Sequence, residues 1–185
     1  MEQTRGINLT GNIRVFRNAG EDGKVRYRTT LSHKNADDTF TNAGIGIRFR
    51  NGVEFADEST LVAVKSAKLD FFKSNEGYPV FYLFAFDAET SDDEEARKGL
   101  NLTGGQVMIF RNEGEDGKVR YRMTVSHKNA DDTYTNAGID VRFNKDIDLP
   151  DRTIVDIKSA KLDFYKNKAN QPVYFVRAFD FEIVG

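Results

Sequence analysis

The sequence contains no cysteine. That absence excludes a disulfide framework, thiolate metal sites and a cysteine nucleophile, and it is typical of a reducing compartment. No apolar run approaches the roughly 18 residues that a membrane span needs, and the first seven residues are too polar and too short for a signal peptide. We therefore expect a protein of the cytoplasm that has no membrane partner.

A net basic charge is also lacking. The formal charge is −2, and the acidic segment 90–99, TSDDEEARKG, accounts for it with four acids and two bases. The rest of the chain is then close to neutral, which argues against wrapping duplex DNA by bulk attraction. Any polyanion must bind in a local groove. Tryptophan is absent, but the chain has 15 Phe and 7 Tyr.

The most prominent feature of the sequence is an internal repeat. GEDGKVRYRTTLSHKNADDTFTNAGI at 20–45 returns at 114–139 as GEDGKVRYRMTVSHKNADDTYTNAGI, and KSAKLDF at 65–71 returns at 158–164. About 49 of roughly 81 aligned positions are identical. The chain is a tandem duplication of one folding unit. This predicts domains at 1–89 and 100–185 joined by the linker 90–99. That linker can form a short helix from 92 to 98.

Apolar residues alternate with a period of two in nearly every segment, so both units read as all-β. In the first unit the pattern predicts strands around 13–16, 25–32 and 42–49, with a turn at AGEDGK and a hairpin at KNADDT. The loop 51–60 can hold at most one helical turn. Its counterpart in the second unit contains Pro150.

The fourth predicted strand changes phase. Val62 and Val64 point inward, but then Ala67, Leu69 and Phe71 take over, which indicates a bulge or bend that closes a small barrel. A last strand opens at Pro79, and because both of its faces are apolar it should lie centrally or be covered on both sides. Five such strands match the five-stranded Greek-key barrel called the OB-fold. The predicted fold is therefore two tandem OB-fold-like barrels, with another small barrel or a meander as the alternative.

The order of these features resembles the bacterial and phage single-stranded DNA-binding proteins. The resemblance lies in VRYRTTLSHKNADDTFTNAGIGIRFRNG, STLVAVKSAKLDFF and YPVFYLFAFDAE and covers most of each unit. It implies the OB-fold, binding to single-stranded DNA, and a bacterial host cell, with a phage or mobile element as a source. The chain departs from the family in having no stacking Trp and no helix after the third strand. It ends in FEIVG, so we expect no recruitment of repair enzymes through an acidic tail.

On this fold, the outward faces of strands two and three would form the nucleic-acid groove. Arginines at alternate positions lie about 7 Å apart, near the phosphate repeat, and can also stack on bases. Phe72 and Tyr165 can supply an aromatic platform. The candidate binding residues are Arg26, Arg28, Lys34, Arg48, Lys68 and Phe72 in the first unit and Arg120, Arg122, Lys128, Arg142, Lys161 and Tyr165 in the second. Alternatively, the arginines pair with Asp70, Asp163 or Glu21 and only solubilise the sheet, and the two aromatic rings simply pack under a loop.

No catalytic or metal-binding constellation emerges. His33 and His127 have only the turn carboxylates nearby and suit a hairpin tip better than a metal site. Ser32 and His33 have no spacing to Asp37 that would orient a triad, and the glycines of TNAGIGI follow no phosphate-binding motif. We expect no enzyme, no cofactor and no metal.

Two functions remain open. The first is non-catalytic binding of single-stranded DNA or RNA by two linked grooves. The second is a phage or mobile-element inhibitor or adaptor, of the anti-CRISPR type, that binds a host nuclease. A third possibility is that only one unit binds, because Arg14 is replaced by Met108 and Phe84 by Arg177 in the second copy.

Overall fold

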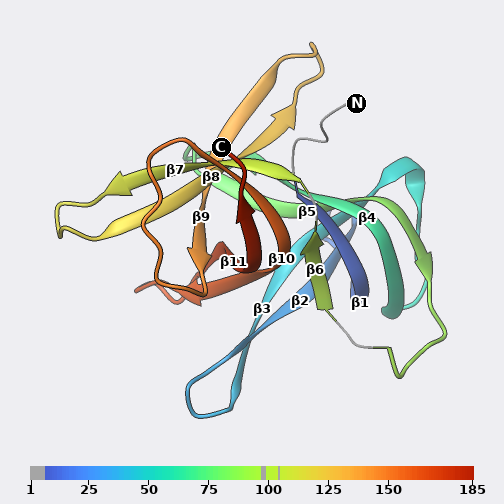
Figure 1. Ribbon diagram of the computed structural model, residues 1–185. Helices are drawn as coiled ribbons and strands as arrows, with labels where there is room; N and C mark the ends of the chain where they lie inside the picture. Colours follow the sequence, from blue (N-terminus) through green and yellow to red (C-terminus); the bar gives the residue numbers. More distant parts are fainter. Residues whose placement is uncertain (1–6, 97–98, 104) are drawn as a thin grey trace.

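The computed structural model describes residues 7–96, 99–103 and 105–185 (Figure 1). Over this part the chain folds into eleven strands and one 3-10 turn. In chain order they are β1 (Asn8–Ala19), β2 (Val25–Lys34), β3 (Phe40–Phe49), η1 (Arg50–Gly52), β4 (Ser59–Lys73), β5 (Pro79–Thr90), β6 (Gly99–Thr103), β7 (Gln106–Glu113), β8 (Val119–Lys128), β9 (Tyr134–Phe143), β10 (Thr153–Lys166) and β11 (Pro172–Ile183).

Strands β1 to β5 close into one barrel. Their order is β1-β2-β3-β5-β4, and β4 returns to pair with β1. All neighbours are antiparallel except β3 and β5, which run parallel. This is the five-stranded Greek-key closure of an OB-fold. We call it the first barrel.

The second copy repeats the closure as β7-β8-β9-β11-β10, with β10 paired back to β7. Its first strand is divided into β6 and β7, and β6 pairs with β10 on one side and with β1 of the first barrel on the other. We call strands β6 to β11 the second barrel. The predicted fold class, all-β with two tandem OB-fold-like units, is confirmed.

The change of phase in the fourth strand is a β-bulge. The register of β4 against β5 shifts on both sides of Ser66, and β10 shifts against β11 on both sides of Ser159. Val62 and Val64 are buried before the shift and Ala67 and Phe71 after it, as the sequence pattern predicts. The bulge lets one long strand bend and contribute to two edges of its barrel.

The predicted last strand, β5, lies between β3 and β4, so its central position is confirmed. The single helical turn expected after β3 is η1, and no helix forms in the counterpart loop between β9 and β10. The prediction of a short helix from 92 to 98 is wrong for residues 92–96, the part that the structure describes. Residues 91–96 form an irregular turn closed by Asp93, whose backbone carbonyl accepts a bond from Ala96, and positions 97 and 98 lie outside the described residues.

The two barrels meet through a pairing of equivalent strands. β1 and β6 run antiparallel, and Leu9 lies opposite Leu102, its own repeat counterpart, with both side chains buried. Equivalent residues facing each other define a local two-fold axis, as in an isologous dimer. The hairpins β2–β3 and β8–β9 accordingly project from opposite ends of the molecule (Figure 1).

Candidate nucleic-acid interface

The alternating arginines of β2 and β8 face outward in both barrels, as the strand pattern predicts. Arg26 and Arg120 remain half exposed, but each forms a 2.8 Å ion pair, with Asp22 and Asp116 respectively, in the preceding turn. The hydrogen bond from Arg26 is the main reason that the pKa of Asp22 lies below its ordinary value. These partners differ from the carboxylates that the sequence suggested.

The second arginine of each pair lies over a glycine of the neighbouring strand. Arg28 donates to the carbonyl oxygen of Gly44 at 3.1 Å, and Arg122 donates to that of Gly138 at 3.3 Å. A Cβ at Gly44 would stand 3.1 Å from the Arg28 guanidinium, so a side chain there would crowd it. Gly44 of TNAGIGI and Gly138 of TNAGID thus make room for guanidinium groups on the sheet surface.

Arg48 on β3 and Arg142 on β9 stack on aromatic rings. The Cζ of Arg48 is 4.2 Å from the ring centroid of Tyr82 and 5.5 Å from that of Phe72. In the second barrel, the Cζ of Arg142 is 4.0 Å from the Phe175 centroid and 5.2 Å from that of Tyr165. Both sites therefore carry a cation held against an aromatic face.

The aromatic candidates Phe72 and Tyr165 are exposed to 45% and 41%. They tilt against Tyr82 and Phe175 with centroid separations near 6 Å. Because close to half of each side chain faces solvent, simple packing under a loop does not account for them. Each ring therefore remains partly exposed beside a stacked arginine.

Each of the four candidate lysines has a carboxylate partner. Lys34 and Lys128 pair with Asp38 and Asp132 in the hairpin turns at 3.0 and 2.8 Å. Lys68 and Lys161 lean toward the buried carboxylates of Asp70 and Asp163, at 3.2 and 3.6 Å. Lys68 nevertheless lies in one cross-strand row with Phe84 and Arg48. Lys161 lies in the equivalent row with Arg177 and Arg142.

A groove of about 810 Å³ opens on the outer face of the second barrel. It brings together three of the candidate residues, Arg120, Arg142 and Tyr165, between β8, β9 and the β9–β10 loop. Its remaining charged lining is mixed, with Lys118 and Lys145 opposed by Asp140, Asp146 and Asp148. Lys128 and Lys161 do not line it.

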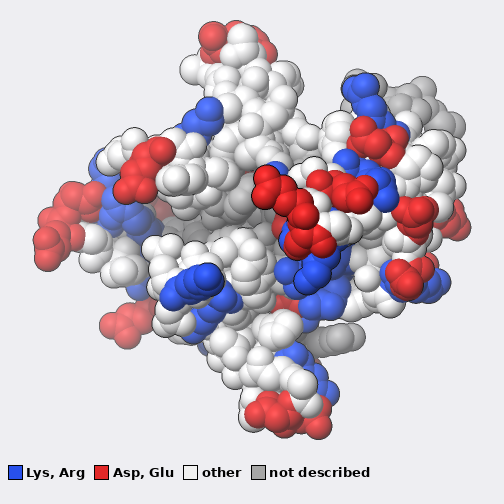
Figure 2. Space-filling view, turned by 90° about the vertical axis from the view of Figure 1, so that its left-hand side faces the viewer, with Lys and Arg blue, Asp and Glu red and all other residues white. Residues whose placement is uncertain are grey.

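Figure 2 shows how charge is distributed on one face of the molecule. Basic side chains form separate groups with acidic side chains beside them, and the projecting tips at the top, left and bottom of this view are acidic. No single basic trough crosses this face. Binding of a polyanion here depends on local groups of side chains, as the near-neutral composition predicts.

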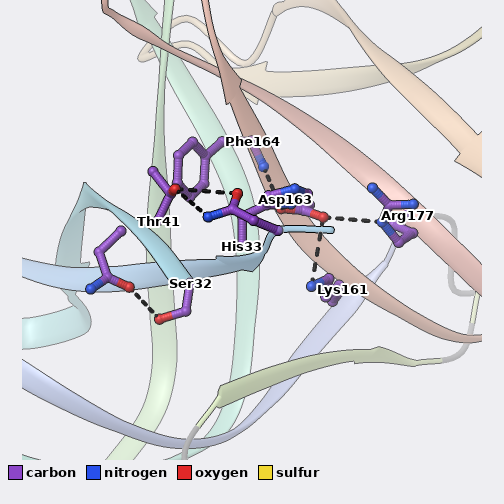
Figure 3. Close-up of polar contacts among 9 residues, drawn as sticks. Ser32, His33, Thr41, Lys161, Asp163, Phe164 and Arg177 are labelled. Atoms are coloured by element: carbon purple, nitrogen blue, oxygen red, sulfur yellow. Dashed lines mark hydrogen bonds and ion pairs between the residues drawn. The ribbon is translucent and has the colours of Figure 1, made fainter. Parts of the chain in front are cut away.

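Sequence reasoning missed a polar cluster between the barrels. The Asp163 carboxylate, fully buried on β10, accepts from the backbone N–H of Phe164 at 2.8 Å and from Arg177 at 3.0 Å, and lies 2.9 Å from Nδ1 of His33 on β2 (Figure 3). Burial alone would raise the pKa of Asp163, but the bonds from Phe164, Arg177 and His33 outweigh it and lower that pKa.

The reciprocal contact joins His127 on β8 to Asp70 on β4, again at 2.9 Å. Burial opposes ionisation of Asp70, and bonds from Phe71, His127 and Lys68 lower its pKa overall. The two histidines therefore join the barrels and do not serve only as hairpin tips. The available signal was that His33 and His127, and likewise Asp70 and Asp163, occupy equivalent positions of the two repeats.

The hydroxyl of Tyr174 adds a third bond across the junction, donating to the Gly44 carbonyl at 2.6 Å. Its repeat counterpart is Phe81, which has no hydroxyl. The junction is therefore not fully symmetric.

Within residues 7–96, 99–103 and 105–185, no group of three or more His, Asp or Glu side chains is placed to hold a metal ion. Over the same residues, no helix is long and apolar enough to cross a membrane.

Two closed five-stranded barrels in tandem, each with arginine and aromatic side chains on its outer sheet, place the chain in the class of tandem OB-fold proteins. The crystal structure of the single-stranded DNA-binding protein from Thermus aquaticus is similar, with a TM-score of 0.57 and 12% identity over 98% of this chain and 95% of that chain. A variant of that protein with a deletion and a substitution gives a TM-score of 0.56 at 12% identity, over 97% and 95%. No protein-family model and no curated protein matches the sequence. The likeness shows a shared fold.

Proposed function

We propose that the protein binds single-stranded nucleic acid, DNA or RNA, without catalysis and without reading its sequence. The observation that carries the proposal is the arginine stacked on an aromatic ring at matching positions of the two barrels, Arg48 on Tyr82 and Arg142 on Phe175. Beside each pair an exposed ring, Phe72 or Tyr165, is open to a base. Stacking of this kind accepts any base, since every base has a flat face.

Phosphates would be held by the outward arginines of β2 and β8. Arg26 and Arg120 are engaged by turn carboxylates, but exposed ion pairs are worth only about 0–1 kcal/mol. A phosphate can form two parallel bonds to a guanidinium, which are stronger than the bonds of such a pair. The existing ion pairs therefore position these side chains without preventing exchange for a phosphate.

The two barrels are fixed to each other by β1 and β6 and by the reciprocal His–Asp contacts. A strand held in one groove raises the effective concentration of its next segment at the other groove. Affinity should therefore increase with oligonucleotide length beyond the span of one barrel, and should fall with added salt.

The test is a fluorescence titration of labelled oligo-dT at low salt. Replacing Arg26, Arg28, Arg120 and Arg122 by alanine should abolish binding. Arg28→Ala with Arg122→Ala should lower affinity and reduce the slope of log affinity against log salt by about 0.7 for each phosphate that is no longer neutralised. The matched control is Lys65→Ala with Lys158→Ala, a repeat-related pair whose partners are Glu89, Asp156 and Glu182. Absence of wild-type binding at about 10 µM protein would refute the proposal.

A protein ligand on the same grooves is the second candidate. It is favoured by the charge pairing, since Arg26, Arg120 and Arg122 all have carboxylate partners and the visible face has no continuous basic trough. The quadruple alanine variant separates the two candidates. If the ligand is a nucleic acid, the variant should lose it, whereas a protein ligand held mainly by the exposed aromatic rings would be retained.

A further inference from the structure

The outer faces of the two barrels differ at one position of the central sheet. On the first barrel, Arg28 of β2 lies in register with Gly46 of β3, and on the second, Arg122 of β8 lies in register with Asp140 of β9. Around this position the arginines at 26, 28 and 48 recur at 120, 122 and 142. The replacement of glycine by aspartate adds one carboxylate to a surface that is otherwise repeated.

That carboxylate pairs directly with Arg122 on β8, beside the groove. Asp140 Oδ1 is 3.0 Å from Nε of Arg122, and both side chains are partly exposed. Arg28 forms no ion pair among the described residues and bonds only to the Gly44 carbonyl. A phosphate approaching the second barrel must compete with Asp140 for the guanidinium edge, and it also meets the negative charge of that carboxylate.

Asp140 lines the 810 Å³ groove together with Arg120 and Arg142. Its charge therefore acts on the whole group of cations predicted to bind phosphate there, and not on Arg122 alone. In the first barrel the corresponding point of the sheet carries no charge.

A second residue difference between the repeats also favours binding by the first barrel. Phe84 on β5 lies in register with Arg48, and its ring packs edge-on against that of Phe86 at 5.1 Å. The repeat counterpart of Phe84 is Arg177, whose guanidinium is bound to the buried Asp163. The first barrel thus adds an aromatic ring to its outer face where the second has a neutralised cation.

We propose that the two grooves are unequal: the first barrel is the high-affinity subsite for a single strand, and Asp140 is the residue that weakens the second. This inference rests on the proposed function. A strand then occupies the first barrel before the second, and the second barrel engages only when the strand is long enough to reach it.

Exchanging the residues at the differing position, Gly46 and Asp140, tests whether the two barrels bind unequally. A Cβ at Gly46 would have the Cβ of Tyr82 at 3.7 Å as its nearest neighbour, an ordinary contact, so Gly46→Asp is sterically allowed. With an oligo-dT long enough for one barrel only, Gly46→Asp and Arg28→Ala should each lower affinity by about three- to tenfold. Arg122→Ala should lower it by less than twofold. With an oligo-dT that spans both barrels, Asp140→Asn and Asp140→Gly should raise affinity by about three- to tenfold.

Asp180→Asn, an exposed carboxylate on β11 outside the groove, controls for the change in net charge, and urea unfolding of each variant controls for folding. Equal losses from Arg28→Ala and Arg122→Ala, with no gain from Asp140→Asn, would overturn the inequality while the proposed function stands. A wild-type protein that binds no oligo-dT would overturn both.

Discussion

At the scale of single residues, the two junction carboxylates are held differently. Asp163 receives bonds from an arginine, a histidine and a backbone N–H, whereas Asp70 has a histidine, a lysine and a backbone N–H. Only Asp163 has a guanidinium partner, because Arg177 is replaced by Phe84 in the first copy. Losing an acceptor that is buried and bonded to charged donors destabilises a fold by roughly 1–3 kcal/mol.

Asp163→Asn should therefore lower the free energy of unfolding by roughly 1–3 kcal/mol, and Asp70→Asn should lower it by less. The amide keeps the shape of the side chain but loses the charge that holds His33 and Arg177. Urea unfolding followed by circular dichroism measures both variants, with Asp180→Asn as the exposed control. Equal losses at the two positions would show that Arg177 adds nothing to the junction.

At the scale of the elements, the strand pairing between the barrels depends on one glycine. Gly11 in β1 has a φ of +144°, and a Cβ there would lie 2.1 Å from the backbone oxygen of Gly99 in β6. That contact is with backbone, so it cannot be relieved by rotating a side chain. Only glycine allows β1 and β6 to approach as they do.

Gly11→Ala should consequently destabilise the protein by about 2 kcal/mol or more, from backbone strain and overlap with β6. Hydrogen exchange should show faster opening of the amides of residues 8–12 and 99–103, where β1 and β6 pair, while the amides of β2, β3, β8 and β9 stay protected. Gly46→Ala is the matched control, since its nearest neighbour would be 3.7 Å away and its φ is ordinary. Unchanged exchange at β1 and β6 would contradict this account of the pairing.

Much of this architecture could be predicted because the relevant signals are local. The bulge in β4 follows from the change of apolar phase between Val64 and Ala67, and the outward position of Arg26 and Arg28 follows from strand alternation. The reciprocal pairs of His33 with Asp163 and His127 with Asp70 could not be predicted, because each joins residues brought together only by the β1–β6 pairing. The same is true of Arg122 with Asp140, since cross-strand partners depend on the register.

At the scale of the whole molecule, the chain is an internal dimer whose two halves are fastened by equivalent strands and by reciprocal polar contacts. Two separate chains would pay the entropy of association at every encounter, whereas here the connection 91–98 removes most of that cost. The outer faces of the two barrels are held in one relative arrangement, to which the contacts of His33 with Asp163 and of His127 with Asp70 contribute.

The junction should therefore weaken in acid. The pKa values of Asp70 and Asp163 are lowered in the fold from an ordinary 3.8, so the unfolded chain takes up these protons first as the pH falls. Their stabilisation is fully present above about pH 4 and is lost as the pH falls through the lowered values. His33, Lys161 and Arg177 face Asp163, and His127 and Lys68 face Asp70, so protonation of either carboxyl leaves cations facing a neutral group.

Urea unfolding at a series of pH values between about 7 and 2, on the wild type and on the double variant Asp70→Asn with Asp163→Asn, isolates this contribution. Four exposed aspartates, at positions 22, 37, 116 and 131, also have lowered pKa values, but they titrate equally in both proteins and cancel in the comparison. The difference in unfolding free energy between the two proteins should shrink as the pH falls below about 4. A difference that persists undiminished to pH 2 would mean that the junction is held by the strand pairing and the Tyr174 bond, and not by the charge of the two carboxylates.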